Sequence, residues 1–295
     1  MFKKTVAVAM LGFSVVAFAE SENYNFETLA TSFNQSYVDS TAVNNMAYSG
    51  RYYLMPVTIR KSEPFAELDY LQRVSSISLE YSDGKLANQY LVRGDYKPRT
   101  INGTFYINDF ILALSNTAWD TKFTLANAPA YYYGFDVKTD SIGIGYFIEP
   151  KTSVFLNYTK SNIDYSTDVG TTLTDKAITT NTVYLHSVRS IEDNSFLVMD
   201  FSYAQIKSEA AASNTNNEYG LSAKYYPAPN YYVMSGYAIN GGDDQSAKGK
   251  TVTFGLGYLF TPRLGVLISN STFDVDDSSQ KTDYIKTSVA FGYRF

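Results

Sequence analysis

The last fourteen residues, Thr282 to Phe295, alternate between two kinds of side chain, and this pattern limits the possible folds more than any other. One set of alternate positions carries Ile285, Val289, Phe291, Tyr293 and Phe295, while the other set keeps Lys286 and Arg294. Only an extended strand separates two faces with a period of two residues. An aromatic face opposite a charged face is typical of a barrel with lipid outside and water inside. The pattern therefore predicts that this segment closes a transmembrane β-barrel.

The first nineteen residues have the pattern of a secretory signal peptide. Two lysines precede an apolar run, and alanines at positions 17 and 19 supply a small-x-small cleavage motif. The apolar run is short for a membrane-spanning helix, which needs about 20 residues. We therefore expect a cleaved signal peptide at 1–19 and an exported domain at 20–295.

The composition restricts what the exported domain can be. The chain has no cysteine, which excludes disulfides, zinc-thiolate sites and thiol nucleophiles. No later segment has about 18 uninterrupted apolar residues, so helical membrane spans are excluded. The 27 tyrosines and 19 phenylalanines suit strands, and a mean hydropathy of -0.20 fits strands with one face in water. A net charge of about −7 without the signal peptide disfavours nucleic-acid binding.

Alternating segments recur along the mature chain and predict an all-β fold: an up-and-down antiparallel barrel of fourteen strands, with twelve or sixteen as alternatives. Short turns that contain proline alternate with longer polar connections, as periplasmic turns and extracellular loops do. Asp83-Gly84 is predicted as a tight turn, and the facing of the first and fifth strands stays open. We expect strands at 24–39, 46–57, 74–82, 87–97, 104–118, 140–148, 153–162, 178–188, 195–206, 218–226, 231–239, 251–260, 264–273 and 282–295.

The segment 59–72 breaks the period of two and predicts one or two helical turns that begin near Pro64. Residues 62–82, which include the strand that follows, read SEPFAELDYLQRVSSISLEYS. This sequence resembles a block between the second and third strands of the small porins of Gram-negative outer membranes, which include an Acinetobacter porin. The resemblance covers nearly the whole mature chain and implies a fourteen-stranded porin-like barrel without catalytic residues. Ser62-Glu63 stands where that family usually has a glycine. The connecting position favours a structured periplasmic turn over a binding element. The matching residues are Pro64, Ala66, Glu67, Tyr70 and Leu71.

Residues 119–137 are the longest gap in the pattern and contain the only tryptophan. A long apolar loop can fold into a barrel and narrow its lumen. An outward loop, or a strand extension above the membrane, fits the same residues equally well. As a constriction loop, the segment would act through Trp119, Phe123, Tyr131, Tyr132 and Tyr133.

A soluble β-sandwich is the alternative fold for alternating strands. The outer faces of a sandwich are polar, whereas here the more apolar face persists from strand to strand with tyrosines near its ends. Together with the signal peptide, this difference favours the outer membrane of a Gram-negative bacterium.

The chain offers little for catalysis or metal binding. His186 is the only histidine, and its neighbour Ser187 must point to the opposite face of a strand, so the two cannot act together. The acidic groups at 243–244 and 274–277 lack the twelve-residue calcium-loop pattern. We expect no enzymatic activity, no metal and no cofactor.

Charged residues on the less apolar strand faces are expected to line the lumen, because lysine or arginine facing lipid at mid-membrane costs about 2 to 4 kcal/mol. Their mixed signs predict a water-filled or partly blocked channel without strong ion selectivity. The expected function is passive diffusion of water and small hydrophilic solutes, and the alternative is a non-conducting barrel in adhesion or membrane structure. The predicted pore-lining residues are Arg51, Glu80, Arg93, Asp95, Asp200, Lys224, Lys286 and Arg294.

The expected partners follow from this location. They are outer-membrane lipids and lipopolysaccharide around the barrel, small hydrophilic solutes inside it, and no nucleic acid. Resemblance to outer-membrane proteins in general implies the barrel-assembly machinery as a further partner, which recognises the terminal strand through Phe291, Tyr293 and Phe295.

Overall fold

The computed structural model describes residues 23–37, 42–86, 91–125, 128–167, 173–192, 194–208, 215–242, 248–276 and 281–295. The predicted signal peptide and the acidic pair at 243–244 lie outside these ranges. Within them, neither helix has the length and apolar character needed to cross a membrane.

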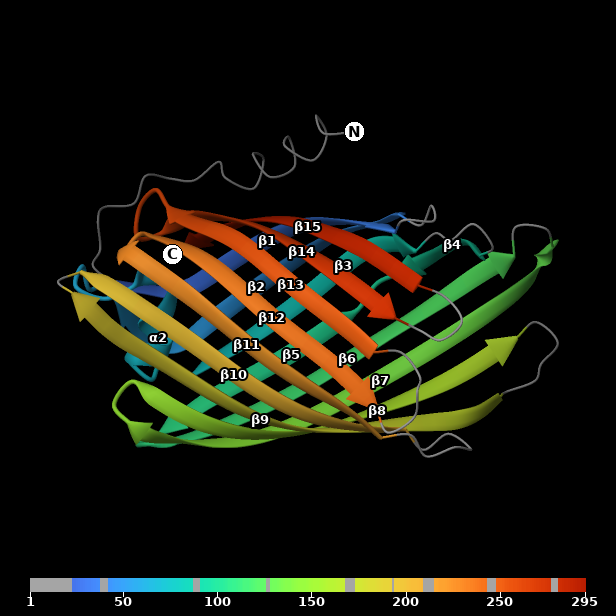
Figure 1. The fold of residues 1–295 in the computed structure, drawn as a ribbon, viewed down its shortest axis with the longest axis horizontal. Helices are drawn as coiled ribbons and strands as arrows, with labels where there is room; N and C mark the ends of the chain where they lie inside the picture. Colours follow the sequence, from blue (N-terminus) through green and yellow to red (C-terminus); the bar gives the residue numbers. More distant parts are fainter. Residues whose placement is uncertain are drawn as a thin grey trace.

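Antiparallel strands make up almost all of the described chain and form one closed barrel (Figure 1). The strands pair with their neighbours in sequence, except that β4 and β5 each pair with β3 and β6, and β1 pairs with β15 to complete the ring, as the terminal strand predicted. The strands are β1 (Asn23–Tyr37), β2 (Ala42–Thr58), β3 (Ser76–Leu86), β4 (Leu91–Tyr96), β5 (Arg99–Ile107), β6 (Phe110–Leu125), β7 (Ala128–Glu149), β8 (Thr152–Thr167), β9 (Leu173–Glu192), β10 (Ser195–Ser208), β11 (Thr215–Ala228), β12 (Tyr231–Gly242), β13 (Lys248–Leu259), β14 (Leu264–Asp276) and β15 (Lys281–Arg294).

The short strands β4 and β5 together occupy one position in the barrel. Both pair with β3 in the same register, since Gly84 lies opposite Tyr96 and Ser76 lies opposite Thr104. Pro98 lies between them and lacks the backbone N–H that a continuous ladder needs. Counted this way, the described residues form the fourteen strands that the sequence predicted.

Two predicted boundaries in the first half of the chain are wrong. Asp83-Gly84 lies inside β3 and does not form a turn. The predicted fifth strand, 104–118, contains the turn between β5 and β6, where Asn108 has a φ of 56°. Asparagine tolerates this left-handed conformation. The residues on both sides of the turn are apolar, so the sequence pattern does not mark the turn.

The outer face of the barrel is apolar from strand to strand, as predicted. Large side chains with more than half of their surface exposed lie on this face of strands spread around the ring. A continuous band of this kind fits a lipid surround. Members of the band include Leu79 on β3, Ile144 on β7, Leu156 on β8, Leu221 on β11, and Phe254 and Leu256 on β13.

Strands β6, β7 and β8 continue beyond this band. The outward pair Ile142 and Tyr158 is followed by the outward pair Asp140 and Lys160. Asn116 on β6 donates a hydrogen bond to Asp140, with 2.7 Å between Nδ2 and Oδ1. Because charged side chains avoid hydrocarbon, the surface of the bilayer lies between these two rows.

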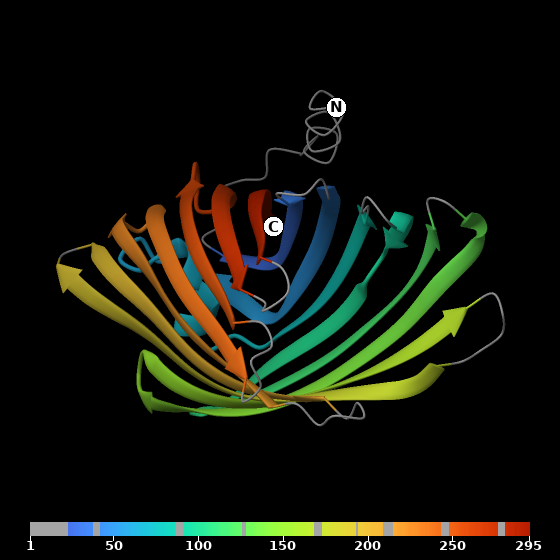
Figure 2. The ribbon, with the colours of Figure 1, turned by 45° about the vertical axis from the view of Figure 1, so that its right-hand side comes forward.

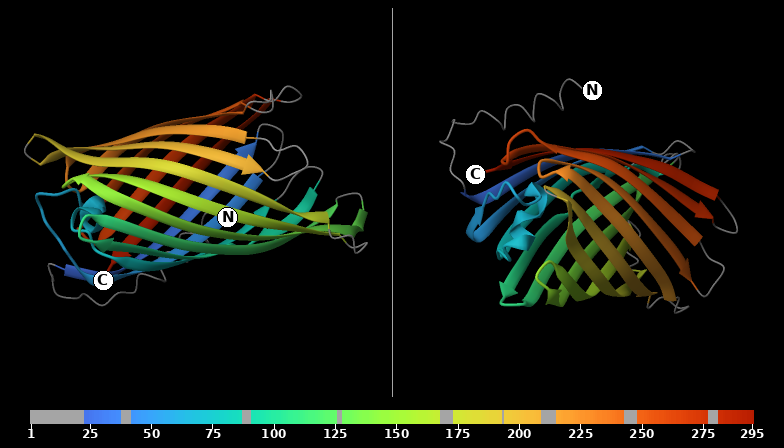
Figure 3. Two further views of the ribbon diagram at one scale, coloured as in Figure 1. Left: turned by 90° about the horizontal axis from the view of Figure 1, so that it is seen from below. Right: turned by 60° about the vertical axis from the view of Figure 1, so that its left-hand side comes forward.

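The connection between β2 and β3 lies at the end of the barrel where the C-terminus lies, and the ribbon views show its helix there (Figures 1 and 3). It contains the 3-10 helix η1 (Phe65–Glu67) and the helix α2 (Leu68–Leu71). The two-residue turns after β7 and β11 lie at the same end, which we therefore assign to the periplasm. Residues 59–75 are called the plug segment below.

Candidate functional site: the barrel lumen and the plug segment

The plug segment lies inside the barrel between two apolar clusters of the wall. Phe65 and Leu68 are buried with Tyr24 and Tyr53 of strands β1 and β2. On the other side, Tyr70 packs against the cluster that strands β9 to β12 contribute. The turned view shows the helix within the ring of strands (Figure 2). These contacts bury apolar surface on both sides of the segment, which favours the docked position.

Glu67 connects the plug segment to the wall formed by β9 to β11. The Lys224 Nζ and Tyr226 Oη atoms donate hydrogen bonds to its Oε1 at 2.8 and 2.9 Å. The His186 Nε2 atom lies 3.8 Å from its other oxygen. Glu67 is 6% exposed, so its charge depends on these neighbours for compensation.

The opposite wall holds the plug segment through two arginines. The Arg51 Nη1 atom lies 3.2 Å from an Asp69 carboxylate oxygen, and the Arg294 Nη1 atom donates to the Phe65 carbonyl at 2.7 Å. Arg294 also pairs with Glu27 at 3.2 Å. Burial raises the pKa of the Asp69 carboxyl, and the Arg51 guanidinium opposes that rise. The segment is thus tied to both sides of the lumen.

Two further side chains fix the helix in place. The Tyr70 hydroxyl donates a hydrogen bond to Ser153 Oγ on β8 at 3.1 Å. Burial raises the pKa of Tyr70 to about 12, so this hydroxyl keeps its proton. Gln72 bonds both the N–H and the carbonyl of Thr58 at the end of β2, at 2.8 and 2.6 Å.

Arg73, which follows the helix of the plug segment, has an unusual backbone conformation, with a φ of 54°. Its guanidinium lies 2.5 Å from Asp109 in the β5–β6 turn and 4.1 Å from the centre of the Phe147 ring. A positive φ outside glycine is strained, and these contacts hold the residue there.

The only histidine lies in the lumen, next to an aspartate. His186 Nδ1 lies 2.5 Å from Asp200 Oδ1, and Ser153 is opposite His186 in the register of β8 and β9. The three residue types match those of a hydrolytic triad. However, His186 Nε2 has no hydrogen-bond partner among the described residues, and Ser153 accepts its bond from Tyr70. The geometry does not activate a serine. Within the described residues, no group of three or more metal-binding side chains is present.

Six of the eight residues predicted to line the pore lie on the inner face of the described strands. Arg51, Lys224 and Arg294 contact the plug segment, and Asp200 contacts His186. The remaining two share rows with lumen-facing hydroxyl residues. Glu80 lies opposite Thr100, and Lys286 lies opposite Ser271.

Asp95 lies on the outer face, so its predicted inward orientation is wrong. It is opposite Lys85 on β3, whose outward positions include Leu79, and it pairs with Lys97 at 3.0 Å. Its position beyond the apolar band explains the error, because the outer face there contacts water and carries charges. The side chain of Arg93 lies outside the described residues.

The residues predicted as a constriction loop form paired strands instead. Trp119 and Phe123 belong to β6, and Tyr131, Tyr132 and Tyr133 belong to β7. Trp119 is opposite Val137, and Phe123 is opposite Tyr133. The alternative of a strand extension above the membrane describes this hairpin.

The inner wall between β3 and β8 differs from the periplasmic end, because hydroxyl and amide groups replace the ion pairs. Thr100 and Thr117 hydroxyls lie 2.9 Å apart, and Thr139 and Ser161 hydroxyls lie at the same distance. The described lumen therefore has a charge-paired floor and a largely uncharged polar wall.

Comparison with known families gives this barrel its relatives. The sequence matches the family described as "Putative general bacterial porin" over residues 2–291. The chain belongs to this porin family. A search of curated protein sequences finds no match.

Solved structures with the same fold include other outer-membrane barrels. The Acinetobacter baumannii outer membrane protein Omp33 has a TM-score of 0.54 and 16% identity, over 94% of this chain and 100% of that chain. The CymD monoaromatic hydrocarbon channel has a TM-score of 0.53 and 12% identity, over 92% of this chain and 89% of that chain. At these identities the similarity shows the fold alone. Family and fold together make the chain an outer-membrane channel protein.

The sequence predicts Arg51, Lys224 and Arg294 as pore-lining residues but does not predict that they dock the plug segment. It identifies Glu67 only through the resemblance, and it does not identify Glu27 or Tyr226. A signal for Glu67 was present, since a glutamate between alanine and leucine in a short helical stretch needs a partner when it is buried.

Proposed function

We propose that this porin-family barrel passes water and small hydrophilic solutes passively across the outer membrane, and that the plug segment restricts its periplasmic end. No reaction chemistry is part of the proposal.

The lumen carries the proposal. Beyond the plug segment, the wall between β3 and β8 carries hydroxyl and amide side chains, which interact with water and polar solutes, while the large exposed apolar residues face outward. The charges at the floor occur as opposite-sign pairs, such as Lys224 with Glu67 and Arg294 with Glu27. Paired charges give weak preference for either ion sign.

Planar-bilayer recording tests the proposal. We expect a small ionic conductance for the whole protein and a larger one when residues 62–72 are replaced by a short Gly-Ser turn. A barrel that inserts but conducts in neither form would overturn the channel and favour the alternative, a non-conducting barrel in adhesion or membrane structure.

The proposal includes export and assembly. The signal peptide at 1–19 would direct the chain to the periplasm, lipids and lipopolysaccharide would surround the apolar band, and assembly machinery would recognise Phe291, Tyr293 and Phe295. Replacing Phe295 with serine should lower the amount of inserted barrel without changing the conductance of each channel that inserts. Quantifying folded protein in membrane fractions beside single-channel recording measures both quantities.

A further inference from the structure

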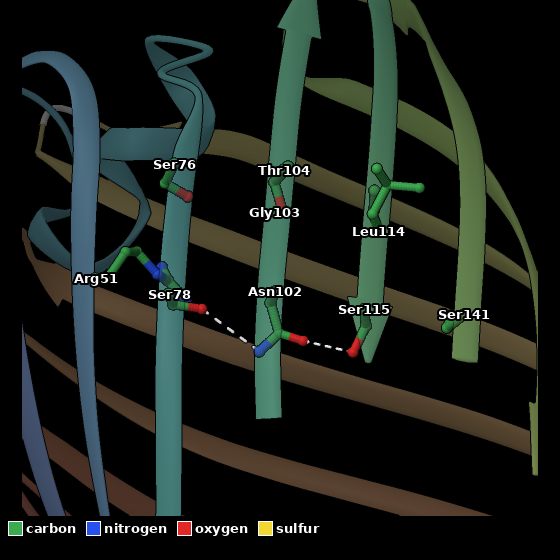
Figure 4. Close-up of a pocket in the computed structure, with 10 residues that line it drawn as sticks. Arg51, Ser76, Ser78, Asn102, Gly103, Thr104, Leu114, Ser115 and Ser141 are labelled. Carbon is green, nitrogen blue, oxygen red and sulfur yellow. Dashed lines mark hydrogen bonds between the residues drawn. The ribbon is translucent and has the colours of Figure 1, made fainter. Parts of the chain in front are cut away.

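A polar cavity of about 270 Å³ opens on the inner wall where β2, β3, β5, β6 and β7 run side by side (Figure 4). Its lining includes Arg51 and the uncharged side chains of Ser78, Asn102, Ser115 and Ser141. The cavity lies on the wall next to the plug segment, because Arg51, which lines it, also pairs with Asp69 of that segment.

Hydrogen bonds between the strands hold these polar groups in fixed positions. Asn102 donates to Ser78 Oγ at 3.4 Å and accepts from the Ser115 hydroxyl at 2.6 Å, as the dashed lines in Figure 4 show. Ser141 donates to Asn157 Oδ1 at 2.8 Å. A row of donors and acceptors that is already oriented binds a ligand with less loss of entropy than mobile side chains would.

The charges that line the cavity do not favour an ion as its ligand. Arg51 is the one charged residue among those that line it, and its guanidinium is paired with the Asp69 carboxylate. The remaining lining residues carry hydroxyls or an amide, apart from Gly103, Ala113 and Leu114. A neutral ligand with several hydroxyls matches such a surface, since each hydroxyl both donates and accepts hydrogen bonds.

The size of the cavity limits the ligand. Pockets for drug-sized molecules occupy about 300 to 1,000 Å³, so this cavity suits a smaller molecule. A row of hydroxyls crosses the wall next to the cavity on the side of the outer mouth, through Thr100 with Thr117 and Thr139 with Ser161. A hydroxylated solute that enters from that side meets this row before it reaches the cavity.

We propose that this cavity is a binding site for a small, uncharged, polyhydroxylated solute, and that it makes the channel favour such solutes over others of equal size. The inference rests on the proposed function, because the site acts on solutes that pass through the lumen.

Liposome swelling with two neutral solutes of similar mass tests the site. Xylitol both donates and accepts hydrogen bonds through five hydroxyls, whereas the ether oxygens of triethylene glycol only accept them. We expect the whole protein to admit xylitol faster than triethylene glycol at low concentration. In Asn102→Leu, which keeps a similar volume, the xylitol rate should fall about 2- to 10-fold while the triethylene glycol rate stays the same.

Asn240→Leu is the matched control. Asn240 lies on β12, on the opposite side of the barrel, and it faces inward because it is separated from the inward Tyr232 by an even number of residues. It should leave both rates unchanged. Ser115→Ala, which removes one hydroxyl, replaces Asn102→Leu as the test if that variant fails to insert.

The outcomes separate the two proposals. If the whole protein conducts ions, but Asn102→Leu and Ser115→Ala have the same ratio of xylitol to triethylene glycol swelling rates as the whole protein, the binding site is wrong and the proposed channel function remains. If the whole protein and the Gly-Ser turn variant admit neither ions nor solutes, the proposed function fails, and the site fails with it.

Discussion

Two segments interrupt the strand pattern of this chain, and they occupy opposite ends of the barrel. The plug segment turns into the lumen at the periplasmic end, where Glu67 and Asp69 meet cations of the wall. The hairpin of β6 and β7 continues outward in paired strands, with Trp119 opposite Val137. The comparison teaches that apolar content does not draw a segment into this lumen. Carboxylates that match cations on both walls, together with an apolar face, do so.

Removing the plug segment should have the largest effect on conductance, and removing the hairpin tip is its comparison. Replacing 62–72 with a short Gly-Ser turn should raise single-channel conductance roughly threefold or more, because current follows the open cross-section. Removing the hairpin tip, 122–133, should change it little. Planar-bilayer recording of both variants measures the contrast, and a larger rise from the second deletion would reverse the comparison.

Charge reversal at one wall should release the plug segment without shortening it. In Lys224→Glu, a new carboxylate would lie beside Glu67, and the lost charged hydrogen bond alone removes about 1 to 3 kcal/mol of docking free energy. The open state should therefore be populated more often, which lengthens openings in single-channel records. Lys286→Glu, at an inner-face lysine of β15, is the control, and an equal effect there would show that general lumen charge is responsible.

Loss of a single hydroxyl should have a smaller effect in the same direction. Tyr70→Phe removes the bond to Ser153 and about 0.5 to 1.5 kcal/mol of docking free energy. Tyr203→Phe removes a comparable bond to Asn217, on β10 and β11 and away from the plug segment. Longer openings in the first variant only would support the docking role of Tyr70.

The smallest effect is expected at the hairpin. Trp119→Ala removes a large side chain from a paired strand beyond the apolar band, and the paired backbone of the hairpin remains. Conductance should stay within about a factor of two, since the backbone that sets the wall is unchanged. A several-fold increase would mean that Trp119 narrows the outer mouth and that the plug segment is not the main restriction.

Much of the barrel could be predicted from the sequence, for reasons that particular elements illustrate. Strand β13 alternates outward Phe254 and Leu256 with inward Thr253 and Gly255, and such a period allows one facing only. The sequence does not predict the β5–β6 turn, because the residues on both sides of it are apolar. It also predicts the wrong orientation for Asp95, because the rule that charged side chains face inward holds only within the apolar band.

The sequence by itself determined the up-and-down barrel and its apolar outer face, because a period of two and a shortage of helical spans depend on local order along the chain. It predicted fourteen strands but left twelve and sixteen open, and the structure decided the number. Only the tertiary structure decided that the plug segment lies in the lumen. Glu67 finds Lys224 157 residues later, and Arg294 reaches the Phe65 carbonyl across 229 residues, and such pairings depend on the closure of the ring and not on neighbouring positions.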